Sequence, residues 1–162
     1  MEEPKIIIKR PRDCSKDEQL SFKHLVVEGG QVKPEGLDRK ISECKFLGFC
    51  YVGNELASIA AIKTKDESYF NGLCEKASAE LPDKSPTLEL GYCFTNHHHR
   101  GKKYNSRVND ALLEKIKGHE VFATTAHDSM HSYFVIRNFK KVGKPYDGTY
   151  NKGIVLYLKN SK

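Results

Sequence analysis

The sequence lacks several features that would each indicate a particular class of protein. No run of about 18 apolar residues is present, so no segment is predicted to cross a membrane. The first 13 residues, MEEPKIIIKRPRD, hold one patch of three isoleucines, which is too short for the core of a signal peptide. The five cysteines are odd in number, scattered and never spaced as CxxC, which argues against a disulfide framework or a cysteine zinc site. We therefore expect reduced thiols and a cytoplasmic location.

The composition is that of an ordinary globular protein. Hydrophobic residues make up 38% and charged residues 30% of the 162 positions, so we expect one domain over residues 1–162 with a substantial core. The formal net charge of +6 favours an anionic partner. A phosphorylated cofactor, an acidic protein and a nucleic acid would each satisfy that charge, so the charge alone leaves all three open.

Apolar periodicity and turn residues predict strands alternating with helices. Strands are expected at residues 5–9, 46–51, 56–63, 87–95, 120–126 and 153–158. Helices are expected from the cap Ser15 to Gly29-Gly30, and at residues 37–44, 74–80 (ended by Pro82), 105–117 and 129–137. A hairpin turn is expected at Gly53-Asn54. The strand–helix–strand order of the second half requires at least one parallel pair, which makes this a mixed α/β domain.

The junction between the strand at 87–95 and the helix at 105–117 is strongly basic, since it reads TNHHHRGKKYNS. A helix start exposes unpaired backbone N–H groups and the positive end of the helix dipole, which together attract anions. Arg100, Lys102 and Lys103 add full charges there, and Gly101 allows a ligand to approach the backbone. The residues alone thus indicate a phosphate or pyrophosphate site at 99–106, with a solvated basic loop as the alternative.

The run ELGYCFTNHHHRGKKYNSRVNDALLEKI, residues 89–116, resembles motif A of the GNAT superfamily of acyl-CoA-dependent N-acyltransferases. Its strand begins ELGY, Arg100 and Gly101 match the start of the family's Arg/Gln-x-x-Gly-x-Gly/Ala loop, and the helix contains ALL. The two signature glycines fall on Lys103 and Asn105. Lys103 fits the loop if its φ stays negative, and asparagine is a residue type that tolerates the left-handed region. The segment AHDSMHSYFVIRNFKKVG resembles a further stretch of the family.

The resemblance implies a fold and a cofactor. The fold would be a single GNAT-like domain with a mixed, mostly antiparallel sheet of about six or seven strands, a splayed parallel pair and about four flanking helices. Acetyl-CoA would be the acyl donor, and backbone groups of Phe94 and Thr95 would meet its thioester and pantetheine. The residues that would hold its pyrophosphate are His99, Arg100, Gly101, Lys102, Lys103, Tyr104 and Asn105.

The resemblance also implies direct attack of a primary amine on the thioester. Glu89 stands where many members have a catalytic base, with a solvent-side strand residue as the alternative reading. Phe134 replaces the tyrosine that commonly protonates the leaving thiolate, and Tyr133 lies about 100° around the helix from that position. The acid would then be His127, His131 or water.

The acceptor, a small molecule or a protein, would contact residues 27–37 and 145–151. Glu28, Glu35 and Asp147 would attract a cationic amine there, and Tyr146 and Tyr150 would pack on its carbon chain, although Asp147 also reads as a turn residue. The family resemblance allows a homodimer, but no stretch marks an interface.

Two other readings of the basic junction compete with acyl transfer. Three adjacent histidines do not match the spaced ligands that zinc uses, so we expect no metal. A non-catalytic nucleic-acid-binding domain would use the junction together with Tyr104, Arg107 and Lys115. No recognition motif supports that alternative, and we expect nucleic acid not to be the partner.

Overall fold

A computed structural model describes residues 3–81 and 86–161. In these residues seven strands are hydrogen-bonded neighbours in the order β1-β2-β3-β4-β5-β7-β6. The chain divides into two compact units, residues 1–63 with 90–117 and residues 64–89 with 118–162. The mixed α/β class predicted from the sequence is confirmed. No helix in the described residues is both long and apolar enough to cross a membrane.

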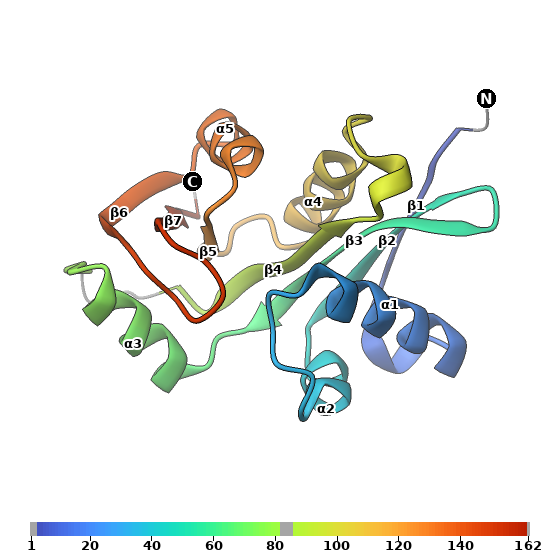
Figure 1. Ribbon diagram of the computed structural model, residues 1–162, viewed down its shortest axis with the longest axis horizontal. Helices are drawn as coiled ribbons and strands as arrows, with labels where there is room; N and C mark the ends of the chain where they lie inside the picture. The colour runs from blue at the N-terminus through green and yellow to red at the C-terminus, as the bar shows by residue number, and fades with distance from the viewer. Residues whose placement is uncertain (1–2, 82–85, 162) are drawn as a thin grey trace. The chain divides into compact units, whose positions relative to one another are not determined.

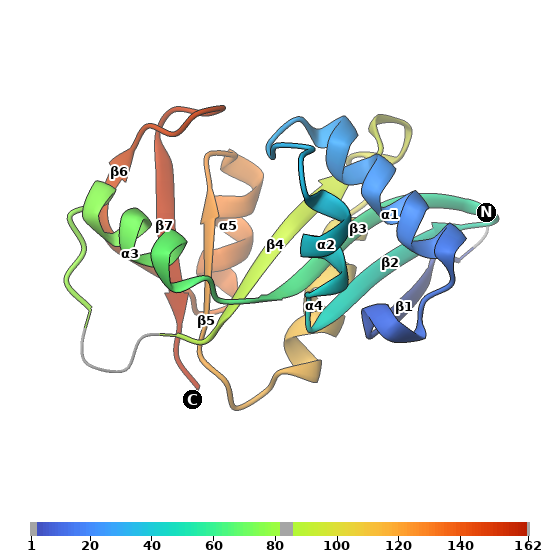
Figure 2. The same cartoon turned by 90° about the horizontal axis from the view of Figure 1, so that it is seen from below.

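The first unit is an antiparallel sheet with helices on both faces. Strands β1 (Lys5–Lys9), β2 (Phe46–Val52) and β3 (Glu55–Thr64) pair in that order. Helices α1 (Lys16–Gly29) and α2 (Leu37–Ser42) cover one face, and α4 (Tyr104–Lys115) covers the other (Figures 1 and 2). The alternation of strand side chains explains this division.

Neighbouring positions of β2 serve opposite faces of this sheet. Leu47 and Phe49 are fully buried in the cluster formed with α1 and α2. Gly48, which lies between them, faces α4, and a Cβ there would lie 2.6 Å from Cγ1 of Val108. Helix α4 therefore sits close to the sheet because residue 48 has no side chain.

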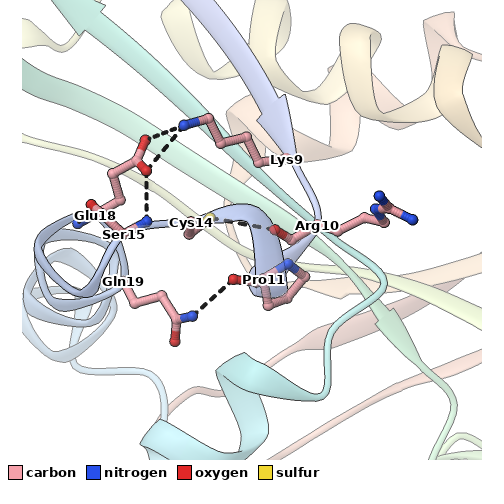
Figure 3. Close-up of polar contacts among 7 residues, drawn as sticks. All are labelled: Lys9, Arg10, Pro11, Cys14, Ser15, Glu18 and Gln19. Atoms are coloured by element: carbon pink, nitrogen blue, oxygen red, sulfur yellow. Dashed lines mark hydrogen bonds and ion pairs between the residues drawn. The ribbon is translucent and has the colours of Figure 1, made fainter.

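The start of α1 is fixed by the predicted cap (Figure 3). Oγ of Ser15 accepts a hydrogen bond from the N–H of Glu18, and the Glu18 carboxylate accepts one from the N–H of Ser15, so both halves of a capping box are present. The same carboxylate lies 2.8 Å from Nζ of Lys9 at the end of β1, and its pKa is lowered, first by that hydrogen bond. Across the short helix η1 (Pro11–Asp13), the Gln19 side chain donates to the Pro11 carbonyl. Helix α1 is thereby tied to the strand before it.

The second unit has its own core. Strand β7 (Ile154–Lys159) pairs antiparallel with β5 (Val121–Thr125) and with β6 (Lys140–Tyr146). The aromatic rings of Phe70 and Phe122 meet edge to face at the centre of the cluster against α3 (Glu67–Lys76). The aromatic rings of Phe134, Phe139 and Tyr157 pack together beside α5 (Asp128–Ile136).

The predicted parallel pair lies between β4 (Leu88–Thr95) and β5, where Leu88 is opposite Val121 and Glu89 opposite Phe122. The predicted hairpin at Gly53-Asn54 is confirmed as well.

The helix predicted at 74–80 lies earlier in the chain than expected, at Glu67–Lys76. The described residues contain five α-helices, where about four were expected. Helix α3 starts after Asp66, whose side chain accepts a hydrogen bond from the N–H of Tyr69. Pro82, the expected end of that helix, lies outside the described residues.

Candidate functional site

The basic junction forms a compact turn in the first unit. After β4 the three histidines form the short helix η2 (His97–His99). Asn96 organises this turn, because its N–H donates to the Ala57 carbonyl of β3 and its side-chain oxygen accepts from the N–H of His98. The Asn96 carbonyl accepts from the N–H of His99 at 2.8 Å. The His99 amide, expected to face a pyrophosphate, is therefore already used within the turn.

The start of α4 has the properties expected of an anion site. The first hydrogen bond of the helix runs from the N–H of Arg107 to the Lys103 carbonyl, so the N–H groups of residues 104–106 precede the helical ladder. The cap residue Lys103 makes no side-chain capping bond. The helix therefore presents three N–H groups that an anion can satisfy. Lys102, Lys103 and Arg100 are all exposed around them.

The loop before α4 contains two residues in the left-handed region. Gly101 has a φ of +81°, with open space where a Cβ would lie. Lys103 has a φ of +62° and a ψ of +23°, so the condition of a negative φ, under which its Cβ would fit the loop, is not met. Lys103 is thus left-handed although it carries a Cβ, and its side chain adds an ammonium group at the helix start.

Arg100 is held against the end of β4. Its Nε donates to the Thr95 carbonyl at 3.2 Å, and its guanidinium lies 5.5 Å from the centre of the Phe94 ring. The Phe94 ring in turn packs on Gly29 at the end of α1, where a Cβ would approach to 3.1 Å. The fixed guanidinium places a permanent charge beside the turn, but it also occupies the Thr95 carbonyl.

Asn105, at the second signature position, is helical and turns its side chain toward β3. Its Nδ2 donates to Oγ of Ser58 at 3.0 Å and to the Ile59 carbonyl at 2.9 Å. Sequence reasoning missed this role, because it assigned only the backbone of Asn105 to the loop. Tyr104 begins the helix half-buried, with its ring 6.2 Å from that of His99.

The histidines contact carboxylates on neighbouring elements. Nε2 of His99 lies 3.2 Å from Oε2 of Glu55, near enough for an ion pair but without hydrogen-bond alignment, and neither ring nitrogen has a hydrogen-bond partner in the described residues. Nδ1 of His97 lies 3.9 Å from Oε1 of Glu28. Within residues 3–81 and 86–161, no three histidine, cysteine or acidic side chains gather as a metal site would require.

Strand β4 carries an irregularity beside this turn. Tyr92 has a φ of +54° in the middle of the strand, a conformation that is unusual for a bulky residue and marks a local distortion. Its ring packs edge to face on Phe22 and lies 4.5 Å from Nζ of Lys63. The backbone just before Phe94 is therefore bent rather than regularly pleated.

Glu89 lies in the second unit and is only 6% exposed, which rules out a solvent-side strand residue. Its register partner Phe122 belongs to the cluster that contains Tyr146. Burial, followed by the charge of Glu89 and then that of Cys74, raises the pKa of Tyr146 to about 12. A buried carboxylate thus has a phenol close by.

Tyr133, which neighbours Phe134, and the two candidate acids His131 and His127 differ in their surroundings. Tyr133 is 5% exposed, with the guanidinium of Arg137 4.5 Å above its ring. Nδ1 of His131 lies 2.6 Å from the hydroxyl of Tyr157. His127 caps α5 without a side-chain bond.

The expected acceptor residues are also unlike one another. The side chain of Asp147 accepts from the N–H of Gly153, which favours its reading as a turn residue. Tyr146 is 9% exposed and Tyr150 is 49% exposed. One further hollow in the first unit contains no residue of the basic turn and is lined by Cys14, Lys16, Gln19, Leu20, Asp38 and Ile41.

Comparison with solved structures gives the fold. ElaA of Escherichia coli is similar with a TM-score of 0.75 and 14% identity, over 98% of this chain and 100% of that one. An acyl-CoA N-acyltransferase from Pseudomonas aeruginosa has a TM-score of 0.69 and 12% identity, over 97% and 99% of the two chains. The protein yncA of Salmonella typhimurium, solved with its cofactor acetyl-CoA, has a TM-score of 0.66 and 10% identity, over 99% and 95%.

A GNAT-family acetyltransferase from Streptococcus agalactiae is also similar, with a TM-score of 0.66 and 15% identity, over 97% and 96% of the two chains. The sequence matches no protein-family model and no curated protein. The chain therefore has the GNAT acyltransferase fold, as the resemblance predicted.

Proposed function

We propose that this protein is an N-acetyltransferase that moves an acetyl group from acetyl-CoA to a primary amine. The observation that carries the proposal is the start of α4, where three N–H groups precede the helical ladder and the cap residue Lys103 makes no side-chain capping bond. The GNAT fold of the chain supports the same assignment. So does the structure of yncA, a similar protein solved with acetyl-CoA.

The chemistry of the α4 start fits the pyrophosphate of a coenzyme A thioester. A pyrophosphate is a compact anion, and main-chain N–H groups at a helix start bind such anions. Lys102 and Lys103 add charge on the same turn, and Gly101 leaves the approach to the backbone open. We therefore assign pyrophosphate binding to the three N–H groups of residues 104–106, instead of the longer stretch from His99 to Asn105 expected from the sequence.

Acetyl-CoA supplies an activated acyl group when it is bound. The amine must reach it neutral, so a base has to accept a proton from the attacking nitrogen. We assign that role to Glu89, because its carboxylate is buried and has a proton-bearing neighbour in Tyr146. The leaving thiolate would take its proton from His127, His131 or water, since Phe134 has none to give.

The acceptor is proposed to contact residues 27–37 and 145–151. Glu28 and Glu35 are exposed and would attract a cationic amine, and Tyr150 offers a half-exposed ring for its carbon chain. Nucleic-acid binding is the weaker alternative, because the similarity in fold to an acyl-CoA N-acyltransferase favours acyl transfer over nucleic-acid binding.

Isothermal titration with acetyl-CoA tests the proposal directly. The wild-type protein should bind with measurable heat, and the charge reversal Lys102→Glu with Lys103→Glu should weaken binding at least about tenfold, because each charge contributes about 1 kcal/mol at 4 Å in water. Lys115→Glu with Lys117→Glu is the matched control, since it changes the net charge by the same amount at the other end of α4. It should leave the dissociation constant within about threefold of the wild-type value. No heat at millimolar acetyl-CoA would contradict the proposal. A mass-spectrometric screen of amines with acetyl-CoA would then identify the acceptor.

A further inference from the structure

A hydrogen-bonded network joins the start of α4 to strands β3 and β4. Its centre is Ser58 of β3, which is fully buried. The Ser58 hydroxyl donates to the Phe94 carbonyl at 3.1 Å and lies 3.0 Å from Oγ1 of Thr95. It also accepts from Nδ2 of Asn105 at 3.0 Å.

The chemistry of these groups fixes the direction of every bond. A serine hydroxyl has one proton and two lone pairs, and the Ser58 proton goes to the Phe94 carbonyl, which can only accept. Thr95 must therefore donate to Ser58. The second amide proton of Asn105 goes to the Ile59 carbonyl. Because that carbonyl can only accept, the side-chain atom facing it must be the amide nitrogen and not the oxygen. The hydroxyl of Ser58 is thereby fully satisfied.

The network continues along α4 through a second buried amide. Nδ2 of Asn109 donates to Oδ1 of Asn105 at 2.8 Å, and Sγ of Cys93 on β4 donates to Oδ1 of Asn109 at 3.5 Å. Asn109 is fully buried. Two turns of α4 are therefore joined to β4 at Cys93, Phe94 and Thr95, directly or through Ser58.

We infer that Asn105 is a positioning residue for the cofactor, an inference that rests on the proposed function. Its side chain fixes the N–H groups at the start of α4 against the end of β4, so that the pyrophosphate and the thioester of one coenzyme A molecule meet binding groups at a set separation. Preorganisation of this kind raises affinity because less freedom is lost on binding. It also accounts for an asparagine where the motif has glycine or alanine, since neither of those residues has a group that reaches Ser58.

A double-mutant cycle on the dissociation constant for coenzyme A tests this role. Asn105→Ala restores a residue of the motif and improves helix propensity, and Ser58→Ala removes the central hydroxyl from a strand residue that has no proposed contact with the cofactor. Each single variant should raise the dissociation constant about 5- to 20-fold. The double variant should bind within about twofold of the weaker single variant, because both substitutions break the same connection. Asn71→Ala on α3 makes the same change at an exposed helical position and should leave the constant unchanged.

Titration of the folded protein separates the outcomes, since a structural role alone lowers the folded fraction and leaves the dissociation constant of that fraction as it was. Single variants within twofold of wild type, or effects that multiply in the double variant, would overturn the inference and leave the proposed function standing. Wild-type protein that fails to bind coenzyme A would overturn both. If Asn105→Ala does not fold, Asn105→Ser replaces it, because its shorter hydroxyl cannot bond to both Ser58 and Ile59 and should weaken binding as alanine does.

Discussion

The left-handed conformation of Lys103 predicts that glycine is more stabilising than alanine at this position, whereas the opposite order is expected at the neighbouring Lys102. Lys103 has a φ of +62°, and this region costs a residue with a side chain about 1–2 kcal/mol relative to glycine. Glycine loses part of that advantage, about 0.4–1 kcal/mol, through the greater freedom of the unfolded chain. Lys103→Gly should therefore be about 1 kcal/mol more stable than Lys103→Ala. Both variants lose the ammonium group, so their difference isolates the backbone.

Lys102 supplies the control, because it is exposed, adjacent and has no positive φ. There the order should reverse, with Lys102→Gly less stable than Lys102→Ala by about 0.4–1 kcal/mol, because glycine gives the unfolded chain more freedom. Thermal unfolding of the four variants without ligand measures both differences, and about 1 kcal/mol corresponds to roughly 2–4 °C for a chain of this size. If glycine were the less stable residue at both positions, Lys103 would not be left-handed and the proposed shape of the loop would be wrong.

Four further predictions concern the second unit. Gly143→Ala should destabilise the protein by about 3 kcal/mol in urea unfolding, because a Cβ there would collide with the Ala77 carbonyl. Gly118→Ala, with a positive φ but open space, should cost only about 1 kcal/mol, and equal costs would refute the collision. The pKa of Tyr146 is raised to about 12, so the folded state holds the phenol proton more tightly than the unfolded state does. The contribution of this group to the free energy of unfolding is complete below about pH 10. It should fall by on the order of 2 kcal/mol as the pH rises toward 12. Tyr146→Phe should remove that alkaline loss in urea titrations at pH 9 and 11, and an unchanged slope would contradict the shift. Glu89→Gln should lower kcat at least about 100-fold if the carboxylate is the base, and a kcat within threefold of wild type would exclude that role. Tyr133→Phe should keep most of the wild-type kcat, and a loss beyond about 100-fold, the lower range of general-acid contributions, would make Tyr133 the acid.

Features that depend on adjacent residues could be predicted from the sequence. The cap at Ser15, the turn at Gly53-Asn54 and the strand expected at residues 87–95 all follow from short patterns, and the structure contains each of them. Helix α3 was equally open to prediction from its cap Asp66 and the apolar residues Phe70 and Leu73, but the later cysteine and alanine residues drew the expected helix too far along the chain.

Features that depend on distant residues could not be predicted in this way. Intrinsic preference disfavours a left-handed lysine, so the shape of the loop at Lys103 is visible only in three dimensions. The bonds of Asn105 reach residues 46 and 47 positions earlier in the chain. The burial of Glu89 similarly depends on β5 and on the cluster around Phe122, neither of which a strand pattern identifies.

The central claim is that the main-chain N–H groups at the start of α4 bind the pyrophosphate of coenzyme A. Amide chemical shifts recorded during a titration with coenzyme A, and in parallel with pantetheine, which lacks the pyrophosphate, test it most directly. Coenzyme A should move the amide signals of residues 101–106 strongly, and pantetheine should leave them in place. If coenzyme A bound while those six signals stayed unmoved, the account would be wrong.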